Sequence, residues 1–159
     1  MTSRSSARRK PAIFLLVEDD ENDTLLAQRA FKHIPGSVVR PVRDGEEAIA
    51  YLTGQPPYTD DQLYPWPDVI LLDLKMPRMN GFDFLKWVRA QTERDVRLLP
   101  VVVLSASNLQ EDVKKAYAMG ANSYLVKPIS WEELVRVLRG LNEYWTELVE
   151  TPAIGPNES

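Results

Sequence analysis

The segment Val69-Ile70-Leu71-Leu72-Asp73 determines how this 159-residue chain folds, because four apolar residues of buried-strand type run directly into a carboxylate. Three further apolar runs end in polar residues in the same way: Ile13–Val17 in Glu18-Asp19, Val101–Leu104 in Ser105, and Tyr124–Val126 in Lys127. If these runs are parallel strands of one sheet, the polar side chains meet at its carboxyl edge, where open α/β sheets bind ligands.

Helical segments alternate with the apolar runs. A helix is predicted from Glu21 to about Ile34, where Pro35-Gly36 ends it, and a weaker strand follows over Val38–Val42. The buried stripe predicted for this helix consists of Leu25, Leu26, Ala30 and Ile34. Further helices are predicted from Asp44 to Leu52, from Asn80-Gly81 onward, from Glu111 to Met119 and from Ser130 to Val149. Glu47 and Glu133 stand three residues after two of the caps, as in a capping box.

This alternation predicts an α/β domain with a parallel sheet and helices on both faces. The domain is expected over 12–149, with no internal repeat and no second domain. We expect 1–11 to be a disordered basic tail and 150–159 a C-terminal arm or tail. The segment Thr53–Pro67 is rich in Pro, Tyr and Asp and is predicted to be a long surface loop.

Composition excludes several classes of protein. The net charge is −4, so wide binding of nucleic acid is not expected, since phosphate contacts need a basic surface. The chain has no cysteine, which excludes disulfides and thiolate metal sites and fits a cytoplasmic protein. No apolar run is long enough to cross a membrane.

The acids of the predicted edge favour a metal site. Glu18, Asp19 and Asp73 would lie close together, where like charges repel and a divalent cation relieves the repulsion. Taken singly, each polar residue also has an ordinary explanation: Asp73 as a loop cap, Lys127 as a surface lysine and Ser105 as a strand-end hydroxyl. The single histidine, His33, is expected to be a surface residue with no nearby partner.

Four motifs in order resemble the receiver domain of two-component response regulators. They are Glu18-Asp19, then Asp73-Leu74-Lys75-Met76-Pro77 with Asn80-Gly81, then Ser105-Ala106, then Lys127-Pro128. The resemblance covers about Ala12 to Trp145. It implies a flavodoxin-like, doubly wound five-stranded sheet of strand order 2-1-3-4-5.

The resemblance also implies a role for each site residue. Asp73 would accept a phosphoryl group from a phosphohistidine. Glu18, Asp19, Asp73 and the backbone carbonyl of Lys75 would surround Mg²⁺. Lys127 and Ser105 would bind phosphoryl oxygens, and the bond between Lys127 and Pro128 is cis in the family.

A switch is implied as well. In the family, the hydroxyl at Ser105 moves toward the phosphate and Tyr124 turns inward behind it. The chain departs from the common pattern in having Glu18 where many members have Asp, and Ser105 in place of Thr. The third consecutive acid, Asp20, is expected to cap the first helix.

A narrower resemblance links the chain to single-domain regulators of bacterial and cyanobacterial phytochrome kinases. It depends on the long 53–67 segment, the Tyr144-Trp145 pair in a long last helix, and Thr151-Pro152 after it. It implies a sensor histidine kinase of the bacteriophytochrome type as donor, and a homodimer through the fourth helix, fifth strand, fifth helix and arm. The expected partner surface consists of Leu141, Tyr144, Trp145, Leu148 and Pro152.

Three other functions compete with this interpretation. A Mg²⁺-dependent aspartyl-phosphate phosphohydrolase needs a second Asp two residues after the nucleophile, and that position is Lys75. A nucleotide-binding module would need a glycine-rich loop where Glu18-Asp19-Asp20 stands. A receiver-like scaffold that is never phosphorylated is the remaining alternative. The sequence favours a phosphoacceptor that signals by protein contact and is not an enzyme.

Overall fold

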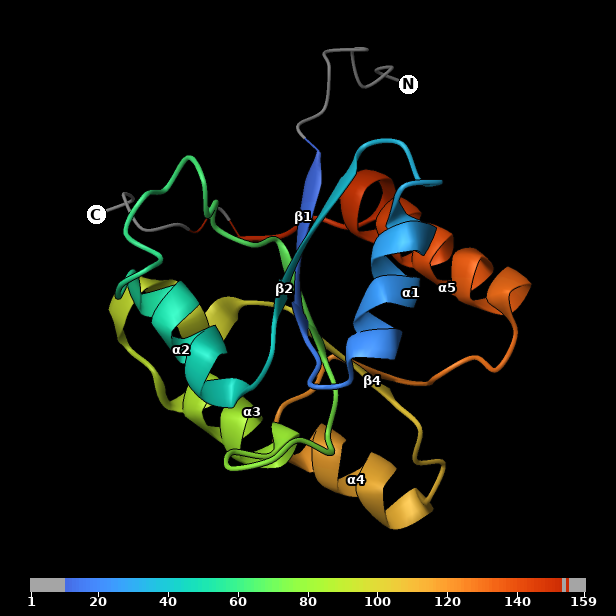
Figure 1. Cartoon of the computed structure of the whole chain (residues 1–159). Helices are drawn as coiled ribbons and strands as arrows, with labels where there is room; N and C mark the ends of the chain where they lie inside the picture. Colours follow the sequence, from blue (N-terminus) through green and yellow to red (C-terminus); the bar gives the residue numbers. More distant parts are fainter. Residues whose placement is uncertain (1–10, 153, 155–159) are drawn as a thin grey trace.

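The computed structural model describes residues 11–152 and residue 154, arranged around a five-stranded parallel sheet (Figure 1). The strands are β1 Ala12–Val17, β2 Ser37–Val42, β3 Val69–Leu72, β4 Val101–Ser105 and β5 Ser123–Val126. Their order in the sheet is β2-β1-β3-β4-β5, which confirms the predicted flavodoxin-like topology. The strands β1 and β3 are apolar along their whole length, and β4 is apolar up to its last residue, Ser105, because helices cover both faces of the sheet.

Within the described residues, four α-helices connect successive strands and a fifth follows β5. They are α1 Glu21–Phe31, α2 Gly45–Thr53, α3 Gly81–Ala90, α4 Gln110–Ala118 and α5 Trp131–Glu143. Four begin at a side chain that accepts the backbone N–H three residues later: Asp20, Asp44, Asn80 and Ser130. The predicted cap at Asp20 is therefore confirmed. Glu133 does not complete its capping box, because its carboxylate accepts two hydrogen bonds from Arg136 instead.

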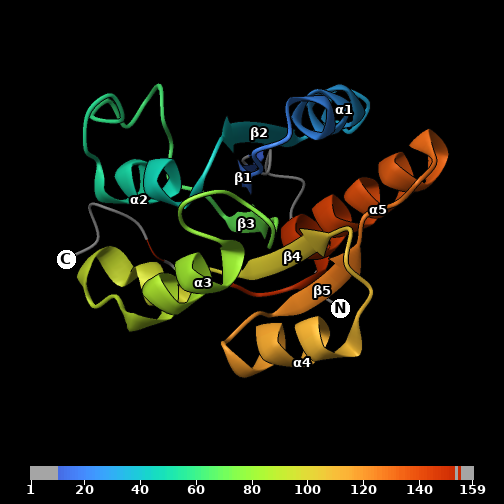
Figure 2. The same cartoon turned by 60° about the horizontal axis from the view of Figure 1, so that its bottom comes forward.

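The helices form two layers (Figure 2). On one face, α1 and α5 pack over a cluster that includes Phe14, Phe31 and Leu138. On the other, α2, α3 and α4 cover a larger cluster that includes Leu52, Phe84 and Ala116. Among 11–152 and 154, no helix is both long and apolar enough to cross a membrane.

The predicted stripe of α1 is wrong in part. Leu25 and Leu26 are 50% and 41% exposed, and the side chains that face the sheet are Ala27, Ala30 and Phe31. The cap at Asp20 fixes the rotation of the helix, and the residues at spacing 27, 30, 31 and 34 then share one face. Ile34 is buried as predicted, although it lies in the turn after the helix.

The end of the chain differs from the predicted helix to Val149. The α-helix stops at Glu143, and one π-helical turn, η2 Tyr144–Leu148, follows it. The segment then crosses the amino edge of the sheet toward the loop between α2 and β3 (Figure 1). There Thr151, Pro152 and Ile154 line a small cavity with Trp66 and Pro100, and Ile154 packs against the α2–α4 core cluster. The predicted disorder of 1–11 falls mainly on residues outside the described part of the chain.

Candidate functional site

The sheet register brings the predicted site residues together at the carboxyl ends of four strands. Val17 of β1 is paired with Leu72 of β3, so the residues that follow them leave the sheet side by side. The backbone N–H of Asp73 donates to the Val17 carbonyl at 3.0 Å. On the other side of β3, the N–H of Lys127 donates to the Ser105 carbonyl at 2.8 Å. Backbone pairing thus fixes where these side chains begin.

Three carboxylates converge in the centre of this edge. Glu18 and Asp73 are only 4% and 6% exposed, whereas Asp19 is exposed to solvent. One oxygen of each lies within 4.8 Å of the others, which is close enough for a single cation to contact all three. An all-oxygen carboxylate set that is open to water on one side suits a hard divalent cation such as Mg²⁺ or Mn²⁺.

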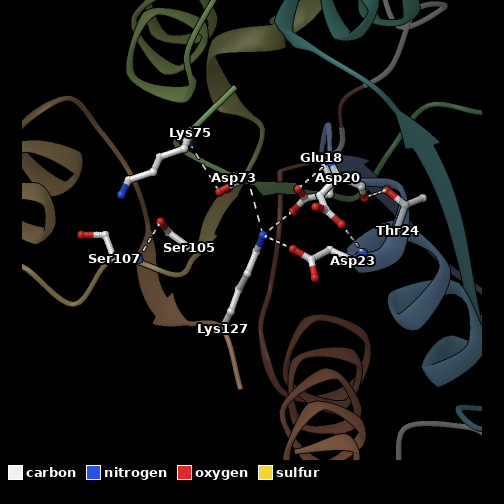
Figure 3. Close-up of polar contacts among 9 residues, drawn as sticks. All are labelled: Glu18, Asp20, Asp23, Thr24, Asp73, Lys75, Ser105, Ser107 and Lys127. Carbon is white, nitrogen blue, oxygen red and sulfur yellow. Dashed lines mark hydrogen bonds and ion pairs between the residues drawn. The ribbon is translucent and has the colours of Figure 1, made fainter. Parts of the chain in front are cut away.

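Lys127 directly follows β5, and its side chain extends to this acidic cluster. Its Nζ is 2.7 Å from a Glu18 oxygen, 2.8 Å from an Asp23 oxygen and 3.6 Å from an Asp73 oxygen (Figure 3). The lysine side chain is 18% exposed, so these contacts are only partly screened by water. One ammonium group is therefore shared among three acids.

Burial dominates the protonation behaviour of the two central acids. Loss of water around Glu18 and the nearby Asp73 charge raise the pKa of Glu18 to about 7, although Lys127 opposes the shift. Burial likewise raises the pKa of Asp73 against the pull of Lys127. Burial alone lowers the pKa of Lys127, but its hydrogen bonds with Asp23 and Glu18 outweigh that effect and the pKa lies above its ordinary value.

Ser105 and Tyr124 meet at the backbone of Ser107. The Ser107 N–H donates to the Ser105 Oγ at 3.2 Å, and the Tyr124 hydroxyl donates to the Ser107 carbonyl at 2.8 Å. Ser105 is fully buried, and its Oγ accepts this bond, so its own hydroxyl proton can be donated to another group. The two residues of the predicted switch are thus linked through one loop residue.

A model of the response regulator receiver domain matches residues 14–139, a range that contains all four strand ends of this site. The chain belongs to the response regulator receiver family. Response regulator Rcp1 of Synechocystis sp. is 34% identical over 145 residues, which cover 90% of this chain and 95% of Rcp1. The receiver domain is a signalling domain. The coverage also shows that the chain and Rcp1 match over nearly their whole lengths.

Solved structures of three receivers match the whole fold. The Mn²⁺-bound form of Rcp1 has a TM-score of 0.77 at 34% identity and covers 90% of this chain and 100% of that one. The phosphorylated cyanobacterial phytochrome response regulator RcpA has a TM-score of 0.79 at 32% identity, with 89% and 99% covered. RPA3017, a response regulator in red light signaling of R. palustris, has a TM-score of 0.82 at 32% identity with the same coverage. Relatives of this receiver therefore include phytochrome response regulators.

The loop after β3 explains the Asn80-Gly81 motif of the receiver. Asn80 caps α3 by accepting the Asp83 N–H, and the Gly81 N–H donates to the Leu74 carbonyl at 2.9 Å. A Cβ at Gly81 would come within 2.4 Å of the Asp73 carbonyl oxygen, so any side chain there would push the end of β3 away. The Lys75 side chain reaches away from Asp73 (Figure 3), while its N–H lies 3.5 Å from an Asp73 oxygen. The ligand role of the Lys75 carbonyl stays a prediction.

Two expectations for the receiver are wrong. The only cis peptide bond among the described residues joins Pro56 and Pro57, so the Lys127–Pro128 bond is trans. His33 is exposed, as predicted, but it has a partner, because its ring packs edge-on against Trp131 with centroids 5.9 Å apart. Helix α1 and the start of α5 pack on the same face of the sheet, a proximity that the sequence does not reveal.

The predicted partner surface is only partly exposed. Leu141 and Trp145 pack against the α1–α5 core cluster, where they cover the end of the sheet. Tyr144 and Leu148 are 48% and 65% exposed, and Pro152 is also exposed. Of the five residues, only Tyr144, Leu148 and Pro152 are therefore available to a partner.

Sequence reasoning missed two polar contributors to the receiver site. Asp23 bonds Lys127, and Asp112 accepts a 2.5 Å hydrogen bond from the Ser107 hydroxyl. The place of Asp23 in the first turn of α1, directly after β1, indicates that it lies near the carboxyl edge, but its contact with Lys127 was not predictable. No comparable signal marks Asp112, whose contact depends on how the loop before α4 turns.

Proposed function

We propose that this chain accepts a phosphoryl group on Asp73 from a sensor histidine kinase of phytochrome type and signals by protein contact. The observation that carries the proposal is the constellation around Asp73: a buried carboxylate between two acids, with Lys127 and Ser105 at the neighbouring strand ends. Transfer to such a carboxylate depends on positioning and charge neutralisation more than on further covalent chemistry.

Glu18, Asp19 and Asp73 would hold Mg²⁺, and the Lys75 backbone carbonyl would be a further ligand. The close approach of their oxygens supports this assignment, and the Mn²⁺-bound form of Rcp1 shows that a similar receiver takes a divalent cation. When bound, the cation offsets the charge of the carboxylates and of the incoming phosphoryl oxygens. The Glu18 side chain must lose its proton to serve, and the pKa of about 7 places that step near neutral pH.

The transfer itself is a displacement at phosphorus. An Asp73 carboxylate oxygen forms a bond to phosphorus while the phosphorus–nitrogen bond of the donor's phosphohistidine breaks. The imidazole, protonated on its other nitrogen, leaves with the electron pair as neutral histidine, so charge and atoms balance. Lys127 and the Ser105 hydroxyl proton would bind phosphoryl oxygens, each as a donor that needs little movement from its strand end.

The output would pass through Ser105 and Tyr124. If the Ser105 hydroxyl turns to the phosphoryl group, its bond from the Ser107 N–H weakens, and the same loop residue holds the Tyr124 hydroxyl. A change at Ser107 therefore alters both ends of the link. This loop leads into α4, so the surface of α4, β5 and α5 would change with phosphorylation.

That surface would also join two copies of the chain in a homodimer, with the segment after Val149 as an arm. β5 is an edge strand of the sheet, and edge strands commonly pair with or are covered by another chain. The large exposed apolar residues there include Leu109, Tyr117, Val126 and Ile129, and Tyr144 and Leu148 follow in η2. The proposal includes a cytoplasmic location, which fits a cysteine-free chain.

Uptake of phosphate from acetyl phosphate tests the acceptor. With Mg²⁺, intact mass is expected to show one added phosphoryl group in the wild type and none in Asp73→Asn. Asp83→Asn is the matched control, because Asp83 is an exposed acid in the first turn of α3. Labelling of Asp73→Asn would refute the assignment. Absence of uptake in the wild type even from a purified phytochrome histidine kinase would favour the unphosphorylated scaffold.

Light scattering tests the dimer. The double variant Tyr144→Ser, Leu148→Ser is expected to weaken self-association about tenfold or more, because it removes two exposed apolar side chains from the surface. Leu63→Ser removes an equally exposed leucine from the 54–67 loop and serves as the control. Equal masses for both variants and the wild type would rule out this surface.

A further inference from the structure

Asp23 belongs to the first turn of α1, outside the three acids that would hold the cation. Its backbone N–H donates to the Asp20 cap at 2.9 Å, which fixes its position at the start of the helix. From there its carboxylate reaches the site and accepts a hydrogen bond from Lys127 at 2.8 Å (Figure 3). The helix dipole also favours a negative charge in this turn, so both the cap and the dipole stabilise Asp23 at this position.

The Lys127 ammonium lies nearer to Glu18, after β1, and to Asp23, in α1, than to Asp73. Its Nζ is within 2.8 Å of oxygens on Glu18 and Asp23, but 3.6 Å from the nearest Asp73 oxygen. Glu18 is nearly buried whereas the Asp23 side chain is 43% exposed, so Asp23 forms the solvent-facing side of the lysine's surroundings. Without Asp23, the remaining acceptors of the ammonium would be the two carboxylates that the cation and the phosphoryl group require.

We propose that Asp23 is a positioning residue, which holds Lys127 on the α1 side of the site until the phosphoryl group arrives. The inference rests on the proposed function, in which Asp73 is the acceptor. In this arrangement the lysine exchanges one partner for another: it leaves the Asp23 oxygen and takes up a phosphoryl oxygen. Asp73 meanwhile keeps only the longer 3.6 Å contact with the ammonium, so its oxygens stay open to the cation and to attack on phosphorus.

Two measurable consequences follow from this placement. If Asp23 is neutral, the ammonium loses its solvent-facing partner, and water exchanges its protons faster. The lysine is then shared between Glu18 and Asp73 alone, where it competes with a divalent cation for the same oxygens. A charge at this short distance from the cluster is enough to change cation affinity severalfold, even after screening by water.

Asp23→Asn is the variant to make, with Asp23→Glu as the conservative exchange and Asp83→Asn as the matched control. Asp83 has the same place in α3, since its N–H donates to the Asn80 cap, but it is exposed and turned to solvent. The first readout is hydrogen exchange of the Lys127 Nζ protons by NMR, with the signal assigned from its loss in Lys127→Ala. The second is the affinity for Mn²⁺, measured from the free-ion signal by electron paramagnetic resonance.

Asp23→Asn is expected to speed exchange of the Nζ protons about fivefold and to weaken Mn²⁺ binding about threefold. Asp23→Glu is expected to restore most of both, and Asp83→Asn to change neither. If the Lys127 Nζ protons exchange equally fast in Asp23→Asn and in the control, the proposal is overturned, even if the Mn²⁺ affinity falls. Loss of the Asp23 charge could weaken Mn²⁺ binding by itself without releasing the lysine. Neither readout uses phosphate, so the two proposals can fail separately. If the wild type does not take up a phosphoryl group but Asp23→Asn still speeds exchange of the Lys127 protons, only the proposed function is refuted.

Discussion

The carboxyl edge of the sheet and the loop between α2 and β3 both bury ionisable side chains, with opposite consequences. In the loop, Tyr58 and Tyr64 pack edge to face with ring centroids 4.8 Å apart, and both contact the ring of Tyr51. The Tyr51 hydroxyl donates to the Pro65 carbonyl at 2.6 Å, and the Tyr58 hydroxyl donates to Glu47. Burial raises the pKa of Tyr51 to about 12 and, with help from Glu47, raises that of Tyr58 further.

The two regions differ in the protonation state that their buried groups need: neutral for the tyrosines of the loop, ionised for the carboxylates of the site. A tyrosine is already neutral at pH 7, so burial favours the form that makes the hydrogen bond. Glu18 and Asp73 must be ionised to bind a cation or attack phosphorus, and burial opposes that form. The loop is therefore stabilised by its buried groups, whereas the site carries a cost that Lys127 only partly offsets. The proposed function would explain why the chain keeps such a cluster.

The largest expected effect comes from Lys127→Ala, which removes the one cation of the cluster. Leaving Glu18 and Asp73 buried without it is expected to lower the free energy of unfolding at pH 7 by about 4 kcal/mol. Phosphoryl uptake is expected to fall about a thousandfold, which corresponds to about 4 kcal/mol in the barrier. Urea unfolding without Mg²⁺ and labelling by acetyl phosphate measure the two effects. Lys114→Ala, on the exposed side of α4, should change neither, and equal stability of both variants would contradict the comparison.

A smaller effect is expected from pH. The folded-state pKa of Glu18 is about 7, above its ordinary value of 4.5, so its contribution to stability is fully present below pH 4.5. That contribution is lost as pH rises through 7, by about 3 kcal/mol in total. The free energy of unfolding in EDTA should therefore fall over this range in the wild type, relative to Glu18→Gln. Parallel curves for the two proteins would show that Glu18 titrates normally.

The same contrast explains what the sequence could predict. Glu18, Asp73, Ser105 and Lys127 were predictable because each directly follows a strand, and parallel strands place their carboxyl ends at one edge. The strand order was available from the family resemblance and is confirmed.

Features that depend on how a helix is rotated or where it stops were not predictable. The exposure of Leu25 follows from the rotation of α1, and the contact between Asp23 and Lys127 joins residues 104 positions apart. The sequence also does not predict that α5 ends at Glu143, because the apolar spacing continues through Trp145 and Leu148. Apolar periodicity indicates a helix but does not say which turn leaves the α conformation.

The smallest expected effects come from removing one hydroxyl in each region. Ser105→Ala leaves the buried Ser107 N–H without its acceptor, and Tyr51→Phe leaves the Pro65 carbonyl without its donor. Each is expected to lower the free energy of unfolding by about 1 kcal/mol, because each loses one hydrogen bond of similar kind. Only Ser105→Ala should slow phosphoryl uptake, by about tenfold, since its hydroxyl would bond a phosphoryl oxygen. Urea unfolding and labelling of both variants test this. Slower uptake in Tyr51→Phe would mean that the tyrosine loop supports the site, and it would contradict the separation of the two regions.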